Sequence, residues 1–190
     1  MRKEDKRSRK TIKAIQDALL RMLAEKRLSD IKIVDLCKNA DINRTTFYLH
    51  FESTEQVLLS IREEIVKRIF DSYKGNSFFY TLEHPLGFLT TCTEVISSYD
   101  GFENFVRNSS EAAYFLEKLK KCFAARAYAD FVNENAGSDD HAFYIIDFMT
   151  AGMLDVFIAW LRSEQETPLE SILDKCAKLL SAGHEALTDR

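Results

Sequence analysis

Residues that interrupt helices are scarce in this chain. Its 190 residues include only two prolines, Pro85 and Pro168, and six glycines. Turn-rich β architectures use both residue types heavily, because their turns need the positive φ of glycine or the fixed φ of proline. Either proline suits the first turn of a helix, where its missing N–H costs nothing. We therefore predict an all-α fold of about nine helices.

Cysteine pairs, an apolar leader and uninterrupted apolar runs are missing too. Cys37, Cys92, Cys122 and Cys176 lie far apart without a C-x-x-C motif, which is typical of reduced thiols in the cytosol. The first residues are charged, so we expect no signal peptide. The most apolar window, residues 143–161, contains two aspartates, which argues against a membrane span. We predict a cytoplasmic protein with no membrane partner.

Signatures of common catalytic and cofactor sites are also missing. The chain has no H-E-x-x-H, G-x-G-x-x-G or G-x-x-x-x-G-K-[ST] pattern, and no G-x-S-x-G turn. His84, His141 and His184 are scattered, and we expect surface or structural roles for them. We predict no catalytic residue, no metal site and no cofactor, and a helical enzyme is the weakest alternative.

Charge is distributed unevenly along the chain. Residues 1–53 contain 13 Lys and Arg against 8 Asp and Glu, a net of +5, whereas residues 54–190 carry 13 against 22, a net of −9. The most basic stretch is residues 2–13. Such a run is either a solvated tail or a contact with a polyanion. A basic N-terminal segment followed by an acidic remainder favours the second interpretation.

Residues 1–53 have the pattern of three helices. Apolar residues three and four apart predict a helix over residues 6–26. A short helix follows over 33–40, and another over 44–50. Asp41-Ile42 breaks the chain between them, and Asn43 is a good N-cap for the third helix. The inward candidates on the second helix are Val34, Leu36 and Cys37.

This arrangement is that of a helix-turn-helix, in which the second helix places its N-terminal residues against base edges in the major groove. Arginine pairs with guanine, and threonine contacts base edges or the thymine methyl. Hydroxyl and imidazole groups donate to phosphates, which positions the protein without reading sequence. Phe47 and Phe51 fall on the inward stripe. The candidate DNA-binding residues are Lys32, Asn43, Arg44, Thr45, Thr46, Tyr48 and His50, with a cap the more expected role for Asn43 and a solvated or packing role the alternative for the others.

The segment closely resembles the DNA-binding signature of the TetR family. There, a short helix leads through Ala-Gly-Val-Ser into a recognition helix ending in Tyr-x-His-Phe, followed by a linker, a lysine and an apolar pair. The matching residues here are Ala40-Asp41-Ile42-Asn43, Thr45-Thr46-Phe47-Tyr48-Leu49-His50-Phe51 and Val57-Leu58-Leu59. The resemblance implies a helix-turn-helix DNA-binding domain over 1–53 and a larger helical effector-binding and dimerisation domain over 54–190.

Two residues depart from the family pattern. Asp41 replaces the usual turn glycine; aspartate tolerates the left-handed conformation, but it brings a carboxylate close to DNA. Thr54 replaces a lysine that contacts phosphate in the family, and Lys32, at a usual hydroxyl position, can compensate in part. We therefore expect DNA binding that is weaker or more demanding than is usual in the family.

The remainder reads as helices over residues 54–74, 85–99, 101–108, 110–135, 139–163 and 168–186, with an irregular stretch over 76–84. Helix 139–163 is apolar almost all round, as expected for a helix between its own core and another surface. We predict a two-fold homodimer through the last two helices, which also resemble the Firmicutes-type TetR subgroup. The candidate dimerisation residues are Phe148, Leu154, Phe157, Trp160, Ile172 and Leu179.

Aromatic residues are frequent between Phe88 and Phe131 and either line an effector pocket or form plain core. The sequence assigns no ligand-binding residues. We predict a ligand-responsive repressor that binds double-stranded DNA at a near-palindromic operator and responds to a small-molecule effector through a tilt of helix 54–74. The alternative is a TetR-fold coactivator that binds a protein or a small molecule instead of DNA.

Overall fold

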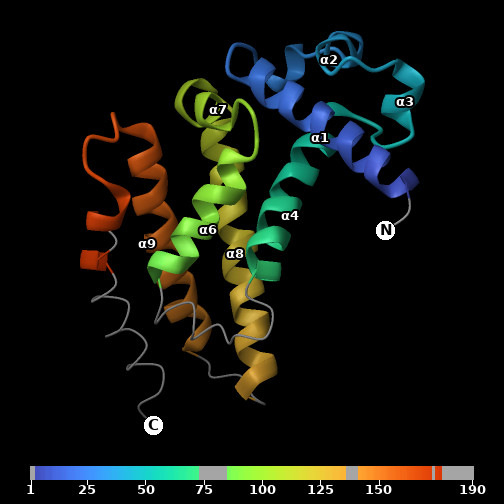
Figure 1. Cartoon of the computed structure of the whole chain (residues 1–190). Helices are drawn as coiled ribbons and strands as arrows, with labels where there is room; N and C mark the ends of the chain where they lie inside the picture. Colours follow the sequence, from blue (N-terminus) through green and yellow to red (C-terminus); the bar gives the residue numbers. More distant parts are fainter. Residues whose placement is uncertain (1–2, 73–84, 136–140, 173, 177–190) are drawn as a thin grey trace. The chain divides into compact units, whose positions relative to one another are not determined.

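The computed structural model describes residues 3–72, 85–135, 141–172 and 174–176 (Figure 1). Every regular element in these ranges is helical, which confirms the all-α prediction. The elements are α1 (Lys3–Leu23), a 3-10 helix η1 (Leu28–Asp30), α2 (Ile33–Asn39), α3 (Arg44–Tyr48), α4 (Thr54–Ser72), α6 (Pro85–Ser97), α7 (Phe102–Asn108), α8 (Ala112–Asn135) and α9 (Ala142–Arg162).

These bounds agree with the sequence patterns to within about one helical turn. Pro85 opens α6, as the first-turn preference of proline predicts. Residues 169–172 and 174–176 are helical, which agrees with the start of the predicted last helix. The rest of that helix and the predicted irregular stretch 76–84 lie outside the described residues.

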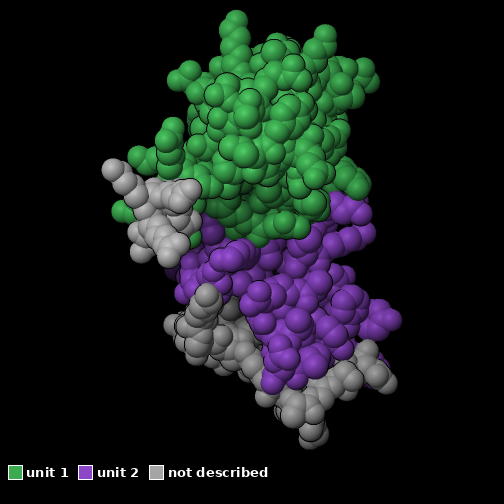
Figure 2. All heavy atoms as spheres, turned by 90° about the vertical axis from the view of Figure 1, so that its right-hand side faces the viewer, with its two compact units in different colours: residues 1–65, 96–115 green, residues 66–95, 116–190 purple. Residues whose placement is uncertain are grey.

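The chain divides into two compact units, coloured green and purple in Figure 2. Unit 1 comprises residues 1–65 and 96–115, and unit 2 comprises residues 66–95 and 116–190. The helices α4, α6 and α8 each continue from one unit into the other. The domain boundary expected between residues 53 and 54 stays a prediction.

The core of unit 1 is built from the inward faces of α1 to α4. Leu19 of α1, Leu36 of α2, Phe47 of α3 and Ile61 of α4 are completely buried. Val34 is a correction: we expected it to face inward, but it is 53% exposed. A helix of seven residues makes only two turns, so its apolar spacing does not decide which face is buried.

A turn between α6 and α7 packs against α1 within unit 1. Asp100 accepts a hydrogen bond from Arg21 at 2.6 Å, and its backbone N–H donates to Asp17 at 3.1 Å. Gly101 adopts a φ of +84°, and a Cβ there would lie 3.0 Å from the backbone nitrogen of Arg21. The turn therefore approaches α1 as closely as glycine alone permits.

The core of unit 2 is rich in aromatic rings. Phe123 of α8 contacts Phe70 of α4 and Phe88 of α6, with centroid distances of 5.7 and 6.0 Å. Helix α9 adds a stripe of buried residues, namely Ala142, Ile146, Met149, Thr150, Met153, Leu154, Phe157, Ile158 and Leu161. Alone among the described helices, α9 is long and apolar enough to cross a membrane, but core helices of soluble proteins share these properties.

Candidate nucleic-acid interface

The turn between α2 and α3 depends on Asp41. This residue has a φ of +53°, in the left-handed region that favours glycine. The N–H of Ile42 donates to the carbonyl of Cys37 at 3.0 Å and so closes the end of α2. Asp41 therefore takes the backbone conformation of the family's glycine, as predicted, and keeps its exposed carboxylate at the turn.

Asn43 caps the N-terminus of α3. Its side-chain Oδ1 accepts the backbone N–H of Thr46 at 2.7 Å and the hydroxyl of Thr46 at 2.9 Å. The predicted capping role of Asn43 is confirmed. Because the cap satisfies one of the free N–H groups at the helix start, a helix of only five residues is stabilised locally.

Two phenylalanines anchor α3 to unit 1. Phe47 and Phe51 are buried, as predicted, and their ring centroids lie 6.0 Å apart. Tyr48 contacts the edge of Phe47 in a T-shaped arrangement at 5.5 Å, while half of its surface stays exposed. The apolar face of the helix is therefore fixed, and its opposite face is left to solvent.

The outward face of α3 carries Arg44, Thr45 and Tyr48, all exposed. The guanidinium of Arg44 donates to the Tyr48 hydroxyl at 3.5 Å and lies 5.9 Å from the centre of its ring. This hydrogen bond raises the pKa of Arg44 above its ordinary value. The guanidinium of Arg44 and the phenol of Tyr48 thus lie together on the exposed face of α3.

The other predicted residues lie around this row. Thr46 and His50 are half-buried, and Lys32 is exposed at the N-cap of α2. Leu49, which we did not single out from the sequence, is 76% exposed at the end of α3. The available signal was its spacing of four residues from Thr45, which puts both on one helical row.

The start of α4 does not present a group to phosphate at residue 54. Thr54 is buried, and its hydroxyl donates to the Glu55 carboxylate at 3.3 Å. Ser53 caps the helix instead, because its Oγ accepts the N–H of Gln56 at 3.3 Å. A hydrogen bond from its own backbone N–H is the main cause that lowers the pKa of Glu55, and a side-chain hydrogen bond with Ser53 adds to it.

The basic residues of α1 fall into two groups. Lys13 pairs with Asp17 and lies over the ring of Tyr99, and Arg21 pairs with Asp100, so both have partners within unit 1. The second group, Lys6, Arg7, Arg9 and Lys10, lies nearer the N-terminus, on the first turns of the helix, and is exposed. Arg2 lies outside the described residues.

No protein-family model matches this chain. Over 55 residues it is 44% identical to the HTH-type transcriptional regulator EthR of Mycolicibacterium smegmatis, a match that covers 29% of this chain and 25% of that protein. EthR of Mycobacterium tuberculosis is 43% identical over 47 residues, which are 25% of this chain and 22% of that protein. The crystal structure of a TetR transcriptional regulator from Streptococcus agalactiae superposes with a TM-score of 0.57 at 23% identity, over 93% of this chain and 97% of that one.

This chain has the fold of a TetR transcriptional regulator, and about a quarter of it is similar in sequence to HTH-type transcriptional regulators. The relatives it matches are named as transcriptional regulators and not as enzymes. It spans about a quarter of the length of the EthR proteins that it matches. The likeness to the streptococcal structure shows the fold.

The predicted dimerisation residues divide into buried and accessible ones. Leu154 and Phe157 are buried in the core of unit 2. Trp160 and Ile172 are half-buried, and Phe148 is 79% exposed. Leu179 lies outside the described residues. The seam stays a prediction, with Phe148 as its most accessible described member.

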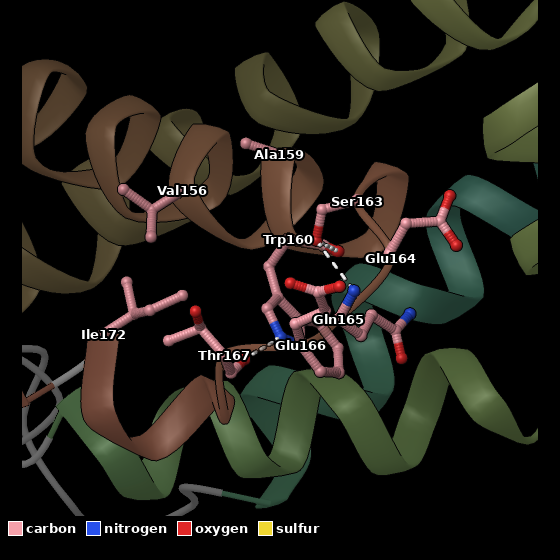
Figure 3. Close-up of a pocket in the computed structure, with 9 residues that line it drawn as sticks. All are labelled: Val156, Ala159, Trp160, Ser163, Glu164, Gln165, Glu166, Thr167 and Ile172. Atoms are coloured by element: carbon pink, nitrogen blue, oxygen red, sulfur yellow. Dashed lines mark hydrogen bonds between the residues drawn. The ribbon is translucent and has the colours of Figure 1, made fainter.

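Trp160 and Ile172 line the same open hollow of about 510 Å³ (Figure 3). The indole N–H of Trp160 donates to the carbonyl of Thr167 at 3.0 Å, which ties the end of α9 to the following loop. The lining also includes Val156, Glu164 and Glu166. The hollow is open to solvent, whereas sites for small molecules typically bury most of the ligand's surface.

Most of the aromatic residues that we considered for an effector pocket are core residues. Phe88, Tyr99, Phe102, Phe105, Phe115, Phe123 and Phe131 are buried, whereas Tyr128 is half-buried and Tyr114 is exposed. Phe102, Phe105 and Phe115 form a cluster of edge-on contacts in unit 1, with centroid distances of 5.3 to 6.0 Å. These rings fit the interpretation that they form the core, and none of them is assigned to ligand binding.

Proposed function

We propose that this chain is a cytoplasmic, TetR-family transcriptional repressor that binds a near-palindromic DNA operator as a homodimer and releases it when a small molecule binds. The observation that carries the proposal is the geometry of α2, the Asp41 turn and α3. The turn has the required left-handed residue, the cap fixes the helix start, and the apolar face is buried. The side chains left on the outward face of α3 form a short row suited to contacting DNA.

Each outward group has a DNA counterpart. Arg44 is charged and can pair with guanine O6 and N7, and the Tyr48 hydroxyl can donate to a phosphate oxygen. Arg44 and Tyr48 lie within reach of each other, with the guanidinium 3.5 Å from the hydroxyl. The exposed cations of residues 6–10 supply the long-range attraction to the polyanion that brings the protein to DNA.

Dimerisation rests on the exposed aromatic groups of α9. Tyr144 and Phe148 lie one helical turn apart and are 71% and 79% exposed. Large aromatic residues on one row are costly in water and typical of interface cores. A two-fold pairing of this face presents two copies of α3, and binding to successive major grooves requires them about 34–36 Å apart.

The response to an effector rests on α4. Residues 54–65 of this helix belong to unit 1 and residues 66–72 to unit 2. In unit 1, Gln16 of α1 donates to Ser60 at 3.1 Å and to Glu64 at 3.2 Å. A tilt of α4 on effector binding is therefore passed to α1, and a changed spacing of the two recognition helices weakens operator binding.

The test is recovery of genomic DNA fragments from the source organism by the purified full chain, followed by sequencing, at low and moderate salt. Arg44→Ala and Tyr48→Ala are tested in parallel. Lys121→Ala is the control, because it removes a cation from α8, outside the helix-turn-helix. We expect a near-palindrome that the wild type and the control enrich and the two α3 variants lose. Affinity should fall steeply with salt, in proportion to the phosphates contacted.

Absence of enriched DNA at either salt contradicts the proposal and favours the coactivator alternative. A sequence enriched equally by wild type and Arg44→Ala contradicts the proposed role of Arg44 in DNA binding. Addition of candidate small molecules to the recovered complex then tests release, and an operator affinity unchanged by every ligand that binds the chain contradicts the effector response.

A further inference from the structure

Leu49 is the most exposed large apolar side chain among the described residues of unit 1. It is 76% exposed, compared with 53% for Val34 and 38% for Leu59. A single exposed leucine is common on protein surfaces, so exposure alone assigns it no role. Its position on α3 is what separates it from the others.

Leu49 lies on the outward face of α3. It is the C-cap residue, with a φ of −71° and a ψ of −19°, so the backbone there still follows the helix. Thr45 precedes it by four residues and therefore shares its row, with Tyr48 beside them and Phe47 on the buried side. Leu49 therefore faces the same way as the residues proposed to meet DNA.

Helix α3 is short enough for this whole row to fit inside the major groove. The helix has five residues, which at 1.5 Å per residue is about 7.5 Å. The groove is about 12 Å wide. A helix this short, once inserted, brings the side chain at its end as well as those at its start to the base edges.

The chemistry of the groove leaves few partners for an isobutyl group. Base edges there carry hydrogen-bond donors and acceptors, and covering them with a hydrocarbon leaves them unpaired at a cost in free energy. The exception is the C5-methyl group of thymine, which is the apolar feature of a standard base pair in this groove.

We propose that Leu49 is a specificity-determining residue that selects thymine by packing on its C5-methyl group, with the methyl of Thr45 on the same row. The inference rests on the proposed DNA binding and names the base chemistry that it reads. Tyr48 and His50 flank Leu49 in the sequence, and Arg44 is exposed on the same short helix. This setting favours a groove contact over a protein interface, whose cores are larger and depleted in charge.

The experiment uses the operator recovered above as a duplex in which thymines are replaced one at a time by uracil. This exchange removes the methyl group and keeps every hydrogen-bonding group of the base. Dissociation constants are measured for the full-length wild type, for Leu49→Ala, and for Leu59→Ala as an equal truncation of an exposed leucine on α4. Urea unfolding of each variant checks that the fold is intact.

At one or two positions of each half-site, uracil should weaken binding of the wild type and Leu59→Ala about fourfold, the factor that roughly 0.8 kcal/mol per buried methyl group gives. Leu49→Ala should bind the thymine operator more weakly by a similar factor and show no further loss with uracil at the same position. Equal uracil sensitivity of wild type and Leu49→Ala at every position overturns this inference alone. Failure to recover any operator overturns the proposed function, and this inference with it.

Discussion

Asn43 accepts both the backbone N–H and the side-chain hydroxyl of Thr46 through a single oxygen, at 2.7 and 2.9 Å. The proton of the Thr46 hydroxyl is therefore already donated within the protein. Toward DNA, Thr46 can accept a hydrogen bond or present its methyl group, but it has no proton to give while this cap is formed.

Replacement of Asn43 tests the cap. Asn43→Ala should lower the free energy of unfolding by about 1 kcal/mol, the usual cost of losing an N-cap side chain. Asn43→Asp should keep the cap and most of the stability, yet bind DNA more weakly because it adds a negative charge at the interface. Urea unfolding and operator titrations measure the two effects, and equal stability of wild type and Asn43→Ala would contradict the first.

The Asp41 carboxylate should oppose DNA binding. Asparagine tolerates the left-handed φ equally well, so Asp41→Asn should leave the unfolding free energy unchanged within about 0.5 kcal/mol and raise operator affinity. Asp30→Asn, which removes an exposed carboxylate of η1 outside the turn, is the matched control and should change affinity less. Unchanged affinity of Asp41→Asn would show that the carboxylate lies away from phosphate.

A side chain at residue 101 should destabilise unit 1. Gly101→Ala forces an L-residue into a φ of +84°, which costs roughly 1–2 kcal/mol, and places its Cβ 2.9 Å from Cγ and 3.0 Å from the backbone nitrogen of Arg21. Repeating the substitution in Arg21→Ala removes the side-chain clash but not the backbone one. The cost in urea unfolding should therefore be smaller in the second background; an equal cost in both assigns all of it to the backbone.

A charge on the exposed row of α9 should separate the proposed dimer. Phe148→Glu should convert a dimer into a monomer at micromolar concentration, as measured by light scattering, because a carboxylate cannot be buried unpaired in a seam. Tyr114→Glu alters an aromatic residue of α8 that is 63% exposed and outside the predicted seam, and it should leave the dimer intact. If the wild type is itself a monomer, the prediction of a dimer is wrong, and so is the proposal that a dimer binds a near-palindromic operator.

The four thiols should react at different rates. Cys37 and Cys92 are buried, and burial raises the pKa of both above the ordinary value, so little thiolate forms at neutral pH. Cys122 and Cys176 are half-buried and should react first with a thiol reagent. Mass spectrometry of the folded and urea-unfolded chain separates the sites, and rapid labelling of Cys92 in the folded chain would contradict its burial.

Local patterns in the sequence predicted the helices and the turn because their signals lie within a few residues. The Asn43 cap, the left-handed Asp41 and the buried Phe47 each follow from residue type and spacing. Val34 was assigned to the wrong face, since two helical turns contain too few apolar residues to define a stripe.

Contacts between distant segments left no comparable signal. The hydrogen bond between Arg21 and Asp100 joins residues 79 positions apart, and nothing in the periodicity of α1 or of the helices on either side of Asp100 indicates it. The exposure of Leu49 likewise depends on how α3 packs on unit 1, because an apolar residue at a helix end fits either face.

The turn at Tyr99–Gly101 has a consequence for protein engineering. Regulators of this architecture invite the construction of chimaeras, in which the DNA-binding segment of one is joined to the effector-binding segment of another. Here the α1 surface is completed by residues 96–115, which share its compact unit and bond to Asp17 and Arg21. A DNA-binding segment cut after residue 53 would lack residues 96–115, which pack on that surface. A segment intended for transfer must therefore include residues 96–115 as well as residues 1–53.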